Sequence, residues 1–156
     1  MLKKEGIEVR LLCSGNFSDV RNPQYITIVR EYIDSNGLKD NISLLGLIDR
    51  EDQLTLMKES RALVQPSLFE GWSTSIEEAK AMNVFMILSD LDVHKEQVDK
   101  NYVMFSRNDA RDLADKIKQV WTTEINITPR DYESDIRSAA RNFLAIVDSV
   151  KTKRTK

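Results

Sequence analysis

Short apolar runs alternate along the chain with longer segments whose apolar residues recur every three or four positions. The short runs hold mostly large aliphatic and aromatic residues and end at a glycine, a proline or a small polar residue, a pattern typical of buried strands. We therefore predict strands at residues 8–13, 42–45, 62–65, 84–88 and 102–105.

A segment with helical periodicity follows each predicted strand. Proline after Asn22 and the carboxylates of Asp49 and Asp109 are the expected signals for helix starts. We expect helices from residue 22 to 37, from 49 through 57, from 74 or 75 past 82, near 96–98, from 109 through 121 and from 132 through 150. Their apolar and aromatic residues, including Trp121 and Phe143, are predicted to lie in the core.

Strands that alternate with helices predict a parallel sheet covered on both faces, because parallel pairing requires crossover connections. The expected fold class is α/β, with a doubly wound, Rossmann-like parallel sheet. In such sheets, ligands bind beyond the carboxyl ends of the strands. Gly15, Gly46 and Gly71 fall at these ends and are candidates for the ligand site.

Length and composition indicate one globular unit. The 156 residues are 41% apolar and 31% charged, which is ordinary for a single α/β domain. We predict one domain over residues 1–156, with its core at about 8–121 and a C-terminal helix at about 131–150. The 23 basic and 25 acidic side chains nearly balance, which argues against a nucleic-acid partner.

Cysteine use and hydropathy indicate the compartment. Cys13 is the only cysteine, so it forms no internal disulfide and is interpreted as a small core residue in a reducing cytoplasm. No run approaches the ~20 apolar residues that cross a bilayer, and no signal peptide follows Met1. We expect a cytoplasmic protein without a transmembrane segment and leave open a peripheral contact at the inner face of the membrane. The basic residues 151–156 are expected to be a solvated terminus.

The segment at residues 66–82 joins a predicted strand to a predicted helix and holds the most informative chemistry. Gly71 lets the backbone approach a ligand closely. The free amides of Ser73, Thr74 and Ser75 at the helix start, together with the helix dipole, favour an anion such as a diphosphate.

Two carboxylates flank this turn. Glu70 lies in the loop, and Glu78 follows on the helix after seven intervening residues. Paired carboxylates suit a sugar, since each oxygen accepts hydrogen bonds from vicinal hydroxyl groups. Another interpretation stays open, because Thr74 and Ser75 each precede a glutamate by three residues and match a capping box. In that case Glu78 only caps the helix, and Glu70 is an ordinary surface carboxylate.

This stretch resembles the retaining glycosyltransferases of the two-domain GT-B architecture, the family 4-like glycosyl transferases group 1. That family includes many bacterial polysaccharide and lipopolysaccharide sugar transferases. Its signature of Pro-Ser, Glu-Gly-aromatic and a second Glu followed by Ala is matched at residues 66–67, 70–72 and 78–79. The segment at 89–97 is similar to the family's Ser-Asp-x-x-Val-His-Arg-Glu pattern.

The resemblance covers about residues 8–121 and implies a role for each matched position. Glu70 would bind the hydroxyls of the transferred sugar at the catalytic centre, and Glu78 would bind the ribose of the nucleotide. The other donor contacts would come from the strand-end glycines, the residues that border the base, and the turn before the helix. These are Gly15, Gly46, Leu47, Ile48, Gly71, Trp72, Ser73 and Thr74.

Several positions depart from the family's pattern. Its Gly-x-Gly-x-Pro turn is replaced by residues 71–75, and Asn83 and Phe85 stand where a glycine and a proline are common. The family's donor domain also begins with a strand and loop that supply an arginine and a lysine to the diphosphate, and nothing before Glu8 matches them. The lysines at 3–4 look like the end of a preceding helix.

The only histidine is His94, which matches a family position. A lone histidine near a helix start more often caps or packs than carries a proton. No cluster of metal-ligating residues surrounds it, and no Asp-x-Asp motif of metal-dependent transferases is present. We expect no metal and no other cofactor.

The resemblance implies the C-terminal, donor-binding half of a GT-B enzyme, without the acceptor-binding half. The expected reaction transfers a hexose from a nucleotide diphosphate sugar to an acceptor hydroxyl with retention, in polysaccharide or lipopolysaccharide synthesis. The chain alone would be inactive, because the missing N-terminal domain brings the acceptor. Two alternatives stay open: a non-catalytic sugar-nucleotide-binding module and a sugar-nucleotide epimerase of the same architecture.

Overall fold

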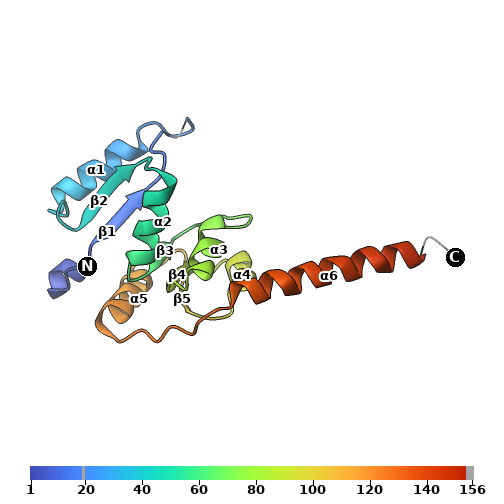
Figure 1. Ribbon diagram of the computed structural model, residues 1–156. Helices are drawn as coiled ribbons and strands as arrows, with labels where there is room; N and C mark the ends of the chain where they lie inside the picture. The colour runs from blue at the N-terminus through green and yellow to red at the C-terminus, as the bar shows by residue number, and fades with distance from the viewer. Residues whose placement is uncertain (19, 154–156) are drawn as a thin grey trace.

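The protein is an α/β structure in which every strand pair is parallel and a helix follows every strand (Figure 1). The computed structural model describes residues 1–18 and 20–153, with side chains described up to residue 150. This arrangement confirms the predicted fold class, a doubly wound, Rossmann-like parallel architecture with helices on both sides of the strands.

The strands form two sheets rather than one continuous sheet. A two-stranded sheet has the order β1-β2, and a three-stranded sheet has the order β3-β4-β5. The strands are β1 (Leu11–Ser14), β2 (Ile42–Gly46), β3 (Leu63–Gln65), β4 (Met86–Ser89) and β5 (Tyr102–Phe105). In Figure 1, β1 and β2 lie together toward the N-terminus, and the other three strands lie at the centre of the molecule.

The helices lie close to their predicted positions. They are α1 (Tyr25–Ser35), α2 (Arg50–Glu59), α3 (Thr74–Ala81), α4 (Asp92–Gln97), α5 (Ala110–Thr122) and α6 (Tyr132–Lys153), with a 3-10 helix η1 (Leu2–Glu5) before β1. The predicted cap of α5 is confirmed, because Asp109 accepts hydrogen bonds from the amides of Arg111 and Asp112. The cap predicted at Asn22 is wrong, since α1 begins at Tyr25 after an intervening turn.

The core lies on both faces of β4, whose four residues are all buried. Met86 and Leu88 face one apolar cluster, and Ile87 faces the other, as the alternation of side chains along a strand requires. The first cluster consists of Met57, Ile76, Ala79, Val84, Met86, Leu88 and Val98, and the second of Ile87, Phe105 and Val120. This buried strand supports the loops that follow β3 and β4.

The N-terminal part of the chain is much more exposed. Among the described residues before Met57, only Ile33 is buried. Leu11 and Leu12 of β1 retain 38% and 48% of their accessible surface. Cys13 is half-buried, and this burial raises the pKa of its thiol.

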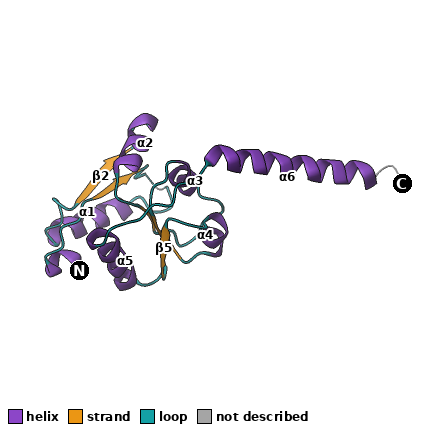
Figure 2. Cartoon of the chain, turned by 60° about the horizontal axis from the view of Figure 1, so that its bottom comes forward, coloured by secondary structure: helices purple, strands orange, loops and turns teal. Residues whose placement is uncertain are grey.

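The C-terminal helix α6 extends away from the rest of the molecule (Figures 1 and 2). Its start is attached through Arg130, which forms ion pairs with Asp99 and Asp135. Phe143, however, is 66% exposed, and Trp121 on α5 is 41% exposed, so the prediction that both lie in the core is wrong. Helical periodicity predicts an apolar face but not what covers it. No helix in the described part of the chain is long and apolar enough to cross a membrane.

Candidate functional site

The residues predicted to form the site lie where the strands end. Gly15 follows β1, Gly46 ends β2, and the loop at residues 66–73 joins β3 to α3. The amide of Gly15 donates a hydrogen bond of 2.8 Å to the carbonyl oxygen of Gly46, so the structure brings these two glycines together. Sites in doubly wound folds lie at this end of the strands.

Gly46 adopts a backbone conformation that favours glycine, with φ at 73°. A Cβ at this position would lie 3.6 Å from the ring of Phe17, which sequence reasoning did not single out. After Gly46, Leu47 is 77% exposed and Ile48 is half-buried. The side chain of Leu47 is therefore accessible from solvent.

A cavity of about 340 Å³ lies near the end of β1. Its lining is mostly apolar and includes none of the predicted site residues; it consists of Asn16, Phe17, Tyr25, Ile26, Val29 and Leu44. Through Phe17 it borders Gly46, so it is adjacent to the predicted donor contacts rather than part of them.

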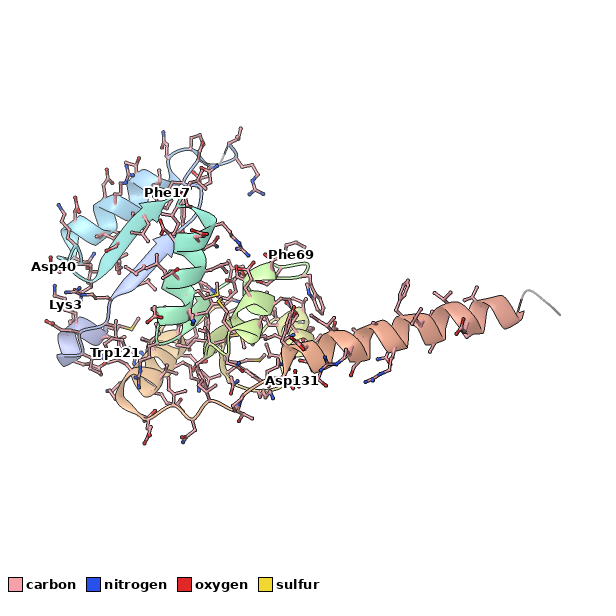
Figure 3. All side chains as sticks on the ribbon, viewed as in Figure 1. Lys3, Phe17, Asp40, Phe69, Trp121 and Asp131 are labelled. Carbon is pink, nitrogen blue, oxygen red and sulfur yellow. The ribbon has the colours of Figure 1, made fainter. Side chains whose placement is uncertain are left out.

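Glu70 is oriented by its own loop. One oxygen of its carboxylate accepts hydrogen bonds from Gln65 Nε2 at 3.2 Å and from Ser67 Oγ at 3.1 Å. Phe69, the residue before Glu70, is 89% exposed, and Figure 3 shows it on the loop at the surface of the molecule. A half-buried carboxylate held in this way has a second oxygen left to accept hydrogen bonds from a ligand.

Glu78 lies on α3 and pairs with a residue that sequence reasoning missed. Its Oε1 atom lies 2.6 Å from a guanidinium nitrogen of Arg50, the first residue of α2, and this hydrogen bond raises the pKa of Arg50. Its Oε2 atom is buried and has no hydrogen-bond partner within the described part of the chain. The position of Arg50 just beyond the end of β2 was the only signal in the sequence.

Glu77 and Glu78 do not cap α3, so the capping-box interpretation is wrong. The N-cap residue is Ser73, which places Thr74 and Ser75 inside the first turn, and its side chain makes no cap hydrogen bond. Glu77 instead binds Lys80 and Gln97. The N-cap is one residue earlier than the Thr74 match required and two earlier than the Ser75 match required, and a neighbouring element replaces the usual side-chain cap.

That element is α4. The amide of Ser73 donates to Gln97 Oε1 at 3.1 Å, so the prediction of a free amide at Ser73 is wrong. The amides of Thr74 and Ser75 make no hydrogen bond with the residues that the structure describes. Gly71 and Trp72 precede them on the surface, and Trp72 is 56% exposed. The amides that remain available to a ligand therefore begin at Thr74, one residue later than predicted.

His94 is a packing residue, as the commoner interpretation of a lone histidine predicted. It is fully buried, and its Nδ1 atom lies 2.9 Å from the carbonyl oxygen of Ser89. The hydroxyl of Ser89 donates to the carbonyl oxygen of Ser67 at 2.7 Å. Nδ1 must carry a proton in order to donate to a carbonyl oxygen, so in the neutral ring Nε2 is an acceptor; Nε2 has no partner among the described residues.

Asn83 explains one departure from the family pattern. It has φ at 57°, a left-handed conformation that asparagine tolerates better than other residues with a side chain. It thus replaces the expected glycine after α3, and its side chain also accepts a hydrogen bond of 2.7 Å from the amide of Arg130.

The chain matches one known protein family. The model of the family described as Glycosyl transferases group 1 matches residues 1–143. The chain belongs to the glycosyl transferases group 1 family. This match confirms the resemblance to the C-terminal domain of GT-B glycosyltransferases and supports glycosyltransferase activity in general. A comparison with curated proteins found no match.

Within this glycosyl transferases group 1 domain, the two carboxylates and the open helix start all follow β3. No group of three or more His, Cys, Asp and Glu side chains able to hold a metal ion occurs among the residues with described positions. The chemistry available at this rim consists of carboxylate acceptors, one arginine and backbone amide donors.

Proposed function

We propose that this chain binds a nucleotide diphosphate sugar at the carboxyl ends of its strands. In the complete enzyme, a hexose from this donor is transferred to an acceptor hydroxyl with retention at the anomeric carbon, in polysaccharide or lipopolysaccharide synthesis. The proposal treats residues 1–156 as a single donor-binding domain, whose partner is a separate acceptor-binding domain. The chain alone is expected to be inactive.

The observation that carries this proposal is the state of Glu78. A buried carboxylate oxygen without a hydrogen bond is costly, because it has lost water and gained no donor. Arg50 already occupies the other oxygen, so the vacant Oε2 atom fits a neutral hydroxyl donor such as that of a ribose. A purely structural ion pair does not require an oxygen left vacant in this way.

The surrounding groups fit the rest of such a donor. The open amides of Thr74 and Ser75, with the dipole of α3, suit the diphosphate, and Glu70 suits the hydroxyls of the transferred sugar. We expect Leu47 and Ile48 to border the base. During transfer the amides would stabilise the leaving diphosphate without a metal or another cofactor, and closure of the acceptor domain would exclude water.

A binding screen tests this proposal. Uridine, guanosine and adenosine diphosphate sugars are titrated into the chain by calorimetry, and the donor that binds is then titrated into Glu78→Ala. We expect a loss of about 1.5–3 kcal/mol, because the variant removes charge-assisted hydrogen bonds. Glu96→Ala, which removes an exposed carboxylate from α4, is the matched control and should bind like the parent.

Equal affinity of Glu78→Ala and the parent chain would contradict the proposed role of Glu78. Product analysis with the full-length enzyme separates the alternatives. A transferase releases the nucleoside diphosphate, an epimerase leaves the nucleotide attached to the sugar, and a binding module leaves the donor unchanged.

A further inference from the structure

We infer that Gln97 is a positioning residue for the diphosphate, and this inference rests on the proposed function. Gln97 is the last residue of α4 and comes 24 residues after Ser73, the N-cap of α3. It contacts neither the open amides nor either candidate donor carboxylate directly. Its role is to hold the backbone from which the open amides project.

The side-chain amide of Gln97 binds both backbone groups of Ser73. Its Oε1 atom accepts from the Ser73 amide at 3.1 Å, and its Nε2 atom donates to the Ser73 carbonyl oxygen at 3.0 Å. A residue in an antiparallel sheet exchanges the same pair of hydrogen bonds with its neighbour. Gln97 therefore holds this peptide as a neighbouring strand would.

This contact is buried and complete. Gln97 is 3% exposed and Ser73 is 4% exposed. The second proton of Gln97 Nε2 is donated to Glu77 Oε1 at 3.2 Å, and Lys80 binds the same carboxylate. Every donor and acceptor of the Gln97 amide is thus used, and water does not compete for it.

The amides at the start of α3 therefore have different roles: one binds Gln97, and the next two are open to a ligand. Because Gln97 takes the amide of Ser73, the first donors left for an anion are those of Thr74 and Ser75. The direction of these donors depends on the Ser73 peptide, since a helix start is oriented by its N-cap residue. Without Gln97, the Ser73 backbone would keep the hydrogen bond of 3.4 Å that its carbonyl oxygen accepts from the Glu77 amide but would lose both contacts with α4, so the start of α3 would be held less firmly.

The opposite end of the same loop is held separately. There the hydroxyl of Ser89 binds the carbonyl oxygen of Ser67, next to the residues that orient Glu70. Loss of Gln97 should therefore affect the diphosphate end of the site and spare the sugar end.

The test compares ligands that differ in phosphate content. Gln97→Met keeps the length of the side chain and removes its hydrogen bonds. The nucleoside diphosphate that binds best among those of uridine, guanosine and adenosine is titrated alongside its nucleoside. We expect diphosphate affinity to fall about fivefold to tenfold, nucleoside affinity to stay constant, and the Ser73 amide to exchange faster with solvent.

Three further variants distinguish positioning from general destabilisation. Ile87→Val loosens the apolar cluster of Ile87, Phe105 and Val120, which does not include the loop at residues 66–73. It should therefore leave the affinity ratio of diphosphate to nucleoside unchanged. Gln97→Glu places a second carboxylate beside Glu77 and should weaken diphosphate binding. Adding Glu77→Gln removes this repulsion and keeps an acceptor for the Ser73 amide, so it should restore part of the affinity, although position 97 then has no donor for the Ser73 carbonyl oxygen.

The inference is overturned if Gln97→Met lowers both affinities equally or neither, or if the double variant binds the diphosphate no better than Gln97→Glu. These results leave the proposed function standing, because the parent chain still binds the donor. If the parent chain binds none of the three nucleoside diphosphates, the proposed function itself fails, and the role of Gln97 fails with it.

Discussion

The two sheets of this protein are built from similar apolar strands but differ greatly in burial. The four residues of β4 are all buried, with Leu88 at 0% exposure, whereas Leu12 of β1 is 48% exposed. β4 has a paired strand on each side and a cluster of apolar side chains on each face. Within the residues that the structure describes, β1 pairs with β2 alone. Burial of a parallel strand thus depends on its neighbours more than on its own composition.

The candidate site follows the same division. Its carboxylates and amide donors lie on the segments that follow β3 of the well-buried sheet. Gln65 and Ser67 donate hydrogen bonds to Glu70, and Gln97 binds Ser73, the residue before the open amides. Gly15, Gly46 and Leu47 lie at the ends of the strands of the more exposed sheet. The ion pair between Arg50 and Glu78 connects α2, which follows β2, to α3. If the donor binds as proposed, the end of the site that takes the diphosphate and sugar is preorganised, and the end that borders the base is less so.

The largest expected effect is a difference in stability between matched leucines. Leu88→Ala should lower the free energy of unfolding by about 2–5 kcal/mol, because it leaves a cavity in the core. Leu12→Ala should lower it by about 1 kcal/mol or less, since much of that side chain already contacts water. Urea denaturation of both variants measures the difference. Equal losses would show that β1 is as well packed as β4.

A ligand effect of intermediate size would sharpen the comparison. If the donor spans both sheets, a nucleotide sugar at 100 times its dissociation constant should protect backbone amides of β1 and β2 by up to about 2.7 kcal/mol of opening free energy. Hydrogen exchange with and without the ligand provides the measurement. Protection confined to β3 and α3 would show that the exposed sheet takes no part in binding. Glu78→Ala at the same ligand concentration is the control.

The smallest effect concerns the attachment of the N-terminus to α5. The hydrogen bond from Lys118 lowers the pKa of Glu5 below 4.5 and raises the pKa of Lys118 above 10.5. The contribution of Glu5 to the stability of the fold is therefore complete above pH 4.5. It is lost as the pH falls through the lower pKa that Glu5 has in the folded chain. The contribution of Lys118 to stability is complete below pH 10.5. It is lost as the pH rises through the higher pKa that Lys118 has in the folded chain.

Glu5→Gln tests this contact. Between these limits the parent chain should be slightly more stable than the variant in thermal unfolding, and the difference should disappear in acid. A difference that persists at pH 2 would contradict the assigned cause.

Much of the fold could be predicted because it depends on consecutive residues. The apolar runs predicted all five strands within a few residues, and Asp109 marked the start of α5 correctly. The turn at 66–73 and both candidate carboxylates were singled out in the same way. The division into two sheets could not be predicted, because the runs at β1 and β3 contain similar residues.

The contacts that organise the site escaped prediction for a related reason. Arg50 and Glu78 are 28 residues apart, and Ser73 and Gln97 are 24 apart. Each of these residues has an ordinary local explanation, such as a surface arginine or a residue on a helix. The capping-box interpretation failed because a side chain from α4 took over the work of a local cap.

The sequence by itself determined which segments become strands and helices, where their carboxyl ends lie, and the family to which the chain belongs, since these depend on periodicity and on short motifs. Only the tertiary structure decided which carboxylate oxygen is left vacant, which amides remain open, and which apolar faces are covered. Those outcomes depend on distances between segments far apart in the chain, and such distances arise only when the elements pack together.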